Sequence, residues 1–308
     1  MASWKGQSRG NLLGYKIFVT LLKNFGLKPA YFLLRFVALY FFLFSPASFR
    51  NVYQVYRHRL KFGFFRSILF VYRNYFIFGQ VLLDKTATLA GFHSQFTFDF
   101  DGEQYLREMA AGNTGCLLIS AHLGNFEMAG HMLERLEARV NIIMLDAEYQ
   151  RIRNYLSSIT QKSFHVIAIR EDNAHVFEIN TALENKEILC IHGDRFLEGS
   201  KTLEIEFLGE KARFPTGPFY LAMKYGIPVS FVFAMKEGKS HYHFYATPLH
   251  KVTFTTNLKQ REENFRAALD IYISKFEEIL RKYPHQWFNY YDFWKLPETM
   301  PNIPGTKN

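Results

Sequence analysis

The chain has 308 residues, of which 48% are hydrophobic, 18% aromatic and 21% charged. A chain this long and this apolar can bury a large core, which excludes an intrinsically disordered protein. The net charge of +9 is unevenly spread, because residues 1–90 hold 13 Lys and Arg residues, a single acid, Asp84, and 22 of the 54 aromatic residues. We therefore divide the chain into a basic, aromatic, membrane-associated helical region, 1–90, and a nearly neutral body, 91–308.

Nucleic acid and an anionic membrane surface are the two usual partners of a basic segment. In residues 1–90 the cations are spaced through dense Leu, Ile, Phe and Tyr, which is typical of helices lying in a lipid interface. We expect an anionic membrane surface and no nucleic acid. The start of the chain has no signal-peptide pattern, so we expect the body to be cytoplasmic. Cys116 and Cys190 lie in apolar runs and are predicted to be buried thiols.

Three helical segments are predicted in residues 1–90. Apolar residues recur at helical spacing from Tyr15 to Phe25, and Gly26 and Pro29 are expected to end that helix. The apolar run Ala30 to Phe44 is shorter than the roughly 20 residues of a bilayer span, and basic clusters flank both its ends. We expect it to embed in one leaflet of the inner membrane, with a single-pass helix or a buried core helix as alternatives. Phe62 to Leu83 should lie along the membrane surface.

From about residue 112, short β-rich runs alternate with helical ones, which predicts an α/β fold with a mainly parallel central sheet flanked by helices. The predicted strands are Gly115–Ser120, Val140–Leu145, His165–Ile169, Glu187–His192 and Pro228–Ala234, with a hairpin at Leu203–Phe207 and Lys211–Phe214 and an edge strand at His241–Ala246. The predicted helices are Phe126–Glu137, Tyr149–Lys162, Ala174–Asn185, Gly217–Tyr225 and Leu258–Lys282.

The first candidate site follows the strand that ends at Ser120, since ligands of open α/β sheets bind at the carboxyl ends of strands. His122 and Glu127 are five residues apart and would point to different sides of a continuous helix. They can meet if His122 lies in the strand-to-helix turn, where Gly124 permits a tight bend. Glu127 would then orient the imidazole as a general base. Spacing alone leaves a structural histidine equally open.

The run His122-Leu123-Gly124-Asn125-Phe126-Glu127 resembles the His-x4-Glu signature of the bacterial lipid A biosynthesis acyltransferases, the late or secondary acyltransferases of the lysophospholipid acyltransferase superfamily. Later blocks are similar in type and order: Gly193-Asp194-Arg195, Phe214-Pro215-Thr216-Gly217-Pro218, Gly226-Ile227-Pro228-Val229 and Pro284-His285-Gln286-Trp287. Two features depart from the family pattern. An arginine interrupts the apolar N-terminal run, and Asn289, Tyr290, Tyr291 and Asp292 replace the family's usual basic residues.

The resemblance implies transfer of a fatty acyl chain from a thioester of acyl carrier protein or coenzyme A to a hydroxyl of a lipid A precursor, at the cytoplasmic face of the inner membrane. His122 would be the base and Glu127 its orienting carboxylate, with no cofactor. Gly124 and Asn125 are assigned to substrate binding, and backbone N–H groups at the start of the helix after Gly124 are expected to receive the developing oxyanion. Acylation of a lysophospholipid, an aminolipid or a polyene lipid, and a non-catalytic lipid-binding protein, are the alternatives.

Further candidates follow other strands. Arg195, held by Asp194, would contact lipid or phosphate, unless the two form only a surface ion pair. Arg170 and Arg213 would bind acceptor phosphates, unless they are merely solvated. Thr216 and Gly217 open a helix and either cap it or line the acyl site. His192 and Asp194 share a strand face and resemble two metal ligands, but no third has suitable spacing, so we expect no metal.

Overall fold

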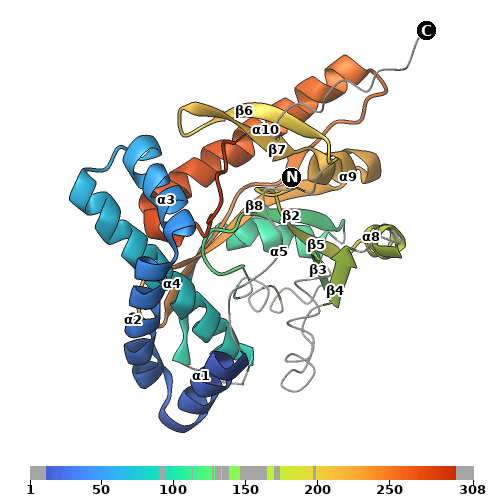
Figure 1. Ribbon diagram of the computed structural model, residues 1–308. Coiled ribbons are helices and arrows are strands. Elements are labelled where there is room, and N and C mark those ends of the chain that lie inside the picture. The colour runs from blue at the N-terminus through green and yellow to red at the C-terminus, as the bar shows by residue number, and fades with distance from the viewer. Residues whose placement is uncertain are drawn as a thin grey trace.

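A computed structural model describes residues 12–89, 95–112, 114–126, 128, 133, 139–145, 165–169, 174–196 and 199–295, with side chains from residue 17 onward. The N-terminal helices stand beside an α/β body, and a long C-terminal helix runs across that body (Figure 1). The predicted fold class is confirmed: the central sheet is mainly parallel and has helices on its faces. The proposed division at residue 90 stays a prediction.

The N-terminal part is a set of linked helices. Its elements are α1 (Leu12–Phe25), α2 (Leu27–Phe44), α3 (Pro46–Gln54), the π-helix η1 (Val55–Arg59) and α4 (Phe64–Leu89). Gly26 has a φ of 77° and separates α1 from α2. Pro29 was wrongly expected to end a helix, since it lies in the first turn of α2, where its missing N–H costs no hydrogen bond. Helix α3 and η1 were not predicted.

The sheet follows the order β1-β9-β8-β2-β5-β3-β4, with β10 paired to β8. The strands are β1 (Thr97–Asp101), β2 (Cys116–Ser120), β3 (Val140–Leu145), β4 (His165–Ile169), β5 (Ile188–His192), β8 (Pro228–Lys236), β9 (His241–Ala246) and β10 (His250–Lys251). Strand β9 is not the edge strand we expected, because β1 pairs with it on its far side. Strand β1 was not predicted, nor was the short helix α5 (Glu103–Ala111) that follows it.

Both faces of the sheet are buried, as the alternating side chains of β2 demonstrate. Leu117 and Ile119 join a core formed with the β6–β7 hairpin (Thr202–Phe207 and Glu210–Pro215) and with helices α9 (Gly217–Tyr225) and α10 (Leu258–Lys282). Cys116 and Leu118 face the opposite core, which includes α5. As predicted, Cys116 and Cys190 are buried free thiols, and burial raises the pKa of Cys116 to about 12.

Other predictions for the body have mixed outcomes. Helix α8 (Ala174–Glu184) and helices α9 and α10 are confirmed nearly to the residue. The predicted helices Phe126–Glu137 and Tyr149–Lys162 lie mostly or wholly outside the described residues.

A buried ion pair joins the N-terminal helices to the body. Lys236 at the end of β8 is 4% exposed and pairs with Asp84 of α4, which is 0% exposed. The hydroxyl groups of Tyr31 in α2 and Tyr242 in β9 also donate to the Asp84 carboxylate. The ammonium group of Lys236 donates in addition to the Lys239 carbonyl at 2.6 Å. Four elements therefore share one desolvated charge pair, and neither charge has a low-energy position without the other.

We expect Lys236→Met to lower the free energy of unfolding by about 3–5 kcal/mol, because it leaves the Asp84 carboxylate buried without its counter-charge. Lys239→Met removes an exposed positive charge three residues away and should change the free energy of unfolding by less than about 0.5 kcal/mol. Urea unfolding followed by tryptophan fluorescence measures both. Equal losses of unfolding free energy in the two variants would show that the Asp84–Lys236 ion pair does not stabilise the fold.

Candidate active site

His122 and Asp194 form the centre of the candidate site. Strands β2 and β5 are parallel neighbours with Ser120 opposite His192, so the residues that follow these strands meet at one edge of the sheet. The Nδ1 atom of His122 lies 2.8 Å from Oδ1 of Asp194, and the His122 backbone N–H donates to Oδ2 at 3.0 Å. The His122 side chain is 19% exposed and that of Asp194 is 2% exposed. A buried carboxylate therefore holds an imidazole that solvent and substrate can reach.

Charge around Asp194 keeps its carboxyl group ionised. Burial alone raises the pKa of this group, but His122, through its charge and hydrogen bond, and the nearby charges of Arg195 and His192 outweigh that effect. The net result is a pKa well below the ordinary range. The indole N–H of Trp287 lies 3.5 Å from Oδ2 as well. Asp194 is therefore an acceptor at any physiological pH, which fixes Nδ1 of His122 as the protonated nitrogen.

Sequence reasoning paired His122 with Glu127 and missed Asp194 as its neighbour. Glu127 lies outside the described residues, so its role stays a prediction. The position of Asp194 in the sequence could have indicated it, because it lies two residues after a buried strand, just as His122 lies two residues after β2. What was missing was the strand order that makes β2 and β5 adjacent.

The turn that carries His122 is held by the chain segment after α10. Gly124 N donates to the Gln286 carbonyl and Phe288 N donates to the His122 carbonyl, both at 2.9 Å, around an antiparallel bridge between Leu123 and Trp287. Gly124 has a φ of 78°, and a Cβ atom there would lie 2.1 Å from the Ala234 carbonyl oxygen. Only glycine fits this tight bend, which is the bend expected from the sequence.

The Asn125 side chain is hydrogen-bonded in the protein interior and does not face an open binding surface. Its side chain is 0% exposed and donates to the Tyr242 hydroxyl at 3.2 Å, while its backbone N–H donates to the Ala234 carbonyl at 2.7 Å. The N–H groups of Gly124 and Asn125 are both bonded to carbonyl oxygens, so they are not placed to receive an oxyanion. The turn is hydrogen-bonded to β8 and to the segment around Gln286, and the assignment of Gly124 and Asn125 to substrate binding stays a prediction.

The other predicted binding residues do not gather at one site. Arg195 donates to the Phe288 carbonyl at 2.9 Å, and its guanidinium group lies 5.7 Å from the centre of the Tyr291 ring. Arg213 pairs with Glu204 across the β6–β7 hairpin at 3.3 Å. The Thr216 hydroxyl donates to the Lys201 carbonyl at 3.2 Å, so it closes the hairpin and makes no cap of its own to α9.

Gly217 opens helix α9 with no atom close to the position of a Cβ. Arg170 lies outside the described residues.

The fold also brings His122 close to His192 and Asp194, so that a third potential metal ligand joins the two found from spacing. His122, His192 and Asp194 each offer one ligand atom, and these atoms lie within 4.8 Å of one another. The imidazole rings of His122 and His192 have centroids 4.1 Å apart. Two of these three groups are hydrogen-bonded to each other, which suits a base with its orienting carboxylate. The expectation of no metal stays a prediction.

We expect Gly124→Ala to destabilise the protein more than Gly226→Ala. Both glycines have positive φ, but the added methyl group at Gly226 meets nothing within 4 Å, while that at Gly124 overlaps the Ala234 carbonyl. Gly226→Ala should cost about 1–2 kcal/mol of unfolding free energy from backbone strain alone. Gly124→Ala should cost more and shift the His122 resonances in a spectrum of histidine-labelled protein. Matching losses and unmoved resonances would contradict the tight bend.

Comparison with known proteins gives three similarities. Residues 77–296 match the family described as bacterial lipid A biosynthesis acyltransferase. Two relatives from Mycobacterium tuberculosis, strains ATCC 25618 / H37Rv and CDC 1551 / Oshkosh, are both named phosphatidylinositol mannoside acyltransferase. Each is 27% identical over 143 residues, which are 45% of this chain and 44% of the relative, so the match spans under half the length of these proteins.

The crystal structure of the 1-acyl-sn-glycerophosphate (LPA) acyltransferase PlsC from Thermotoga maritima aligns with 82% of this chain and 98% of that chain, at 14% identity and a TM-score of 0.38. The family match runs from within α4 to just past the aromatic segment after Trp287, more than half of the chain. It confirms the resemblance noted from the sequence motifs, and the protein belongs to the bacterial lipid A biosynthesis acyltransferase family.

Proposed function

We propose that this protein transfers a fatty acyl chain from a thioester of acyl carrier protein or coenzyme A to a hydroxyl group of a lipid A precursor, with His122 as general base. One observation carries the proposal: a partly exposed imidazole at the carboxyl end of the central strands is hydrogen-bonded through Nδ1 to a buried, ionised carboxylate. Family membership supports acyl transfer as the reaction class.

The chemistry follows from the hydrogen bond at Nδ1. With Asp194 accepting from Nδ1–H, Nε2 of His122 takes the proton from the acceptor hydroxyl as its oxygen attacks the thioester carbonyl carbon. The new C–O bond forms, the C–S bond breaks, and the imidazolium returns its proton to the leaving thiolate. Asp194 stabilises the imidazolium charge between these two steps. Glu127 remains a predicted catalytic residue, and its substitution belongs to the same test.

The acceptor is proposed as a sugar-bearing lipid. The family description names lipid A, and the two relatives are named for a phosphatidylinositol mannoside, so sugar-bearing lipids are common to both. The proposed lipid A precursor is the member of this class that the sequence motifs favour. No cofactor is required, because proton transfer and positioning supply the catalysis.

We also propose that the N-terminal helices dock on the cytoplasmic face of the inner membrane. Among the described residues, one helix, α2, is long and apolar enough to cross a membrane. Its inner face packs through Ala30, Leu34 and Ala38, while its outer face exposes an apolar stripe. That stripe consists of Phe32, Phe36, Leu39, Tyr40, Leu43 and Phe44, each at least 44% exposed. An exposed apolar stripe among exposed cations such as Lys28 and Arg35 favours an anionic lipid interface.

The catalytic prediction concerns His122 and Asp194. Purified protein is incubated with acyl thioesters and lipid A precursors, phosphatidylinositol mannosides and lysophospholipids, and the lipids are analysed by mass spectrometry. His122→Ala should lower kcat by roughly 10²–10⁴-fold. Asp194→Asn should lower kcat by about 10²-fold or more with little change in KM for the thioester, because an amide does not stabilise the imidazolium.

Asp270→Asn is the matched control, since this carboxylate is exposed on α10, and it should leave kcat unchanged. Glu127→Gln tests the predicted second carboxylate. A mass gain on a different acceptor would keep the mechanism and replace the substrate. Full activity in His122→Ala, or no acyl gain on any acceptor by folded protein, would favour the lipid-binding alternative.

The membrane prediction concerns the α2 stripe. Phe32→Asp with Phe36→Asp should weaken binding to phosphatidylglycerol-containing vesicles at least tenfold in a sedimentation assay, because two apolar side chains are lost from the interface. Raising the salt concentration should weaken binding of the unchanged protein, since the cations are exposed. Phe177→Asp is the control, because Phe177 is 75% exposed on α8. Equal binding by all three proteins would exclude the stripe as the docking surface.

A further inference from the structure

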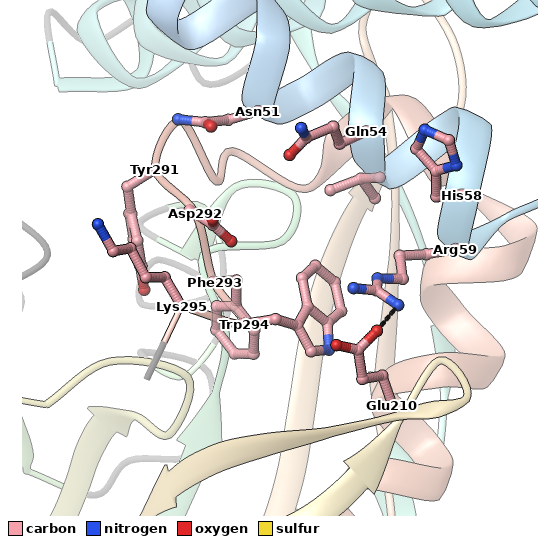
Figure 2. A pocket seen from close by; sticks show the side chains of 11 residues that line it. Asn51, Gln54, His58, Arg59, Glu210, Tyr291, Asp292, Phe293, Trp294 and Lys295 are labelled. Carbon is pink, nitrogen blue, oxygen red and sulfur yellow. Dashed lines mark hydrogen bonds and ion pairs between the residues drawn. The ribbon is translucent and has the colours of Figure 1, made fainter. Parts of the chain in front are cut away.

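A cavity of about 330 Å³ lies between the N-terminal helices and the segment that follows Trp287 (Figure 2). Asn51 and Gln54 of α3 and His58 of η1 line one side, Tyr291 to Lys295 line the other, and Glu210 of the β6–β7 hairpin closes one end. This volume is at the lower end of the range of small-molecule sites, about 300–1,000 Å³. His122 and Asp194 do not line it, so it is separate from the proposed catalytic pair.

The charges that line the cavity cancel. Arg59 is ion-paired with Glu210 (Figure 2), and its guanidinium group lies 4.5 Å from the centre of the Trp294 ring. Lys295 and Asp292 contribute one further charge of each sign. Both acids come from the body of the chain, and the paired Arg59 is not available for a bidentate phosphate contact. The cavity therefore favours a neutral ligand group over an anion.

The remaining lining groups are aromatic rings, amides that donate and accept hydrogen bonds, and a carboxylate that accepts them. Tyr291, Phe293 and Trp294 present aromatic surface, while the amides of Asn51 and Gln54 and the carboxylate of Asp292 offer polar atoms. A cyclic polyol has the matching chemistry, because its C–H faces pack on aromatic rings and its ring-edge hydroxyl groups bond to amides and carboxylates. Asn51 already donates to the Tyr290 carbonyl at 3.0 Å, but a purely aliphatic chain would leave the Gln54 amide and the Asp292 carboxylate without partners.

Tyr291 connects this cavity to the catalytic pair. Its side chain lines the cavity, and the guanidinium group of Arg195 lies 5.7 Å from its ring. Arg195 directly follows Asp194, which holds His122. Through Tyr291, the cavity wall therefore contacts the residue that follows Asp194. The π-helix η1 that forms part of the wall is a rare element that occurs frequently at functional sites.

The position of the cavity also suits a lipid headgroup. Phe64 and Phe65 begin α4, shortly after η1, and are 54% and 83% exposed. If these rings enter the membrane interface as proposed for α2, the cavity wall formed by η1 lies near the level of the headgroups.

We infer that this cavity binds a polyhydroxylated six-membered ring of the acceptor headgroup, a sugar or an inositol, other than the ring or chain that is acylated. The inference rests on the proposed acyl transfer and adds to it a site that selects the acceptor. Gln54 and Asp292 are the specificity residues, since both are polar, partly or fully exposed, and on opposite walls.

Binding is tested without turnover, by saturation-transfer NMR on the full chain in detergent micelles. The probes are methyl α-mannoside, N-acetylglucosamine, myo-inositol, glycerol and inorganic phosphate. At least one ring polyol should receive saturation, while glycerol and phosphate should not. Gln54→Trp, which fills the cavity, should abolish the transfer, and Gln260→Trp, at an exposed position on α10, should preserve it. Transfer to the sugars alone or to inositol alone identifies which ring is bound.

Turnover gives the second measurement. For a lipid acceptor with a ring headgroup, Asp292→Ala and Gln54→Trp should raise the acceptor KM about tenfold and leave the thioester KM unchanged, and Asp292→Asn should recover part of the loss. No saturation of any ring polyol, or saturation that persists in Gln54→Trp, overturns the inference. Ring binding without acyl transfer to any acceptor would instead overturn the proposed function and leave the cavity assignment standing.

Discussion

The pairing between the His122 turn and the segment Gln286 to Phe288 is the constraint on which the candidate site depends. Two backbone hydrogen bonds and the Leu123–Trp287 bridge hold a bend that only a glycine can make at position 124. The same segment accepts hydrogen bonds from Arg195, at Phe288, and from Asn74 of α4, at Trp287. One short stretch of backbone after α10 therefore ties together the strand ends, the arginine beside the base and the N-terminal helices.

This arrangement couples the helices that we propose to contact lipid to the residues that we propose to do chemistry. Asp84 of α4 is buried against Lys236, and the Lys236 backbone is bonded to the side chain of Gln286 at 2.9 and 2.7 Å. Tyr242 links the same carboxylate to Asn125, three residues after His122. Because these contacts are desolvated, displacing the helices would separate Asp84 from Lys236 and leave charges without partners next to the turn. The two parts of the molecule are therefore held in one arrangement.

The adjacent residues Asp194 and Arg195 make contacts with different parts of the molecule. The Asp194 side chain turns inward to the imidazole, where the surrounding positive charge keeps it ionised, and the Arg195 side chain turns toward Tyr291 and the Phe288 carbonyl. A buried anion is hydrogen-bonded to the proposed base, while the neighbouring cation lies against Tyr291, which lines the cavity. In the function that we propose, the polar, aromatic cavity and the apolar stripe of α2 are separate surfaces for the two halves of an amphiphilic acceptor.

The sequence by itself determined most strands of the central sheet, the long helix Leu258–Lys282, the bend at Gly124, His122 as the candidate base and the family. These are local properties, because periodicity and composition record which faces a segment buries. The tertiary structure alone decided that Asp194, 72 residues away, is the neighbour of His122, that β1 covers β9, and that Gln54 and Asp292 face one cavity. The physical reason is that strand order and the packing of distant segments depend on how buried faces match each other, and that information is not contained in any single segment.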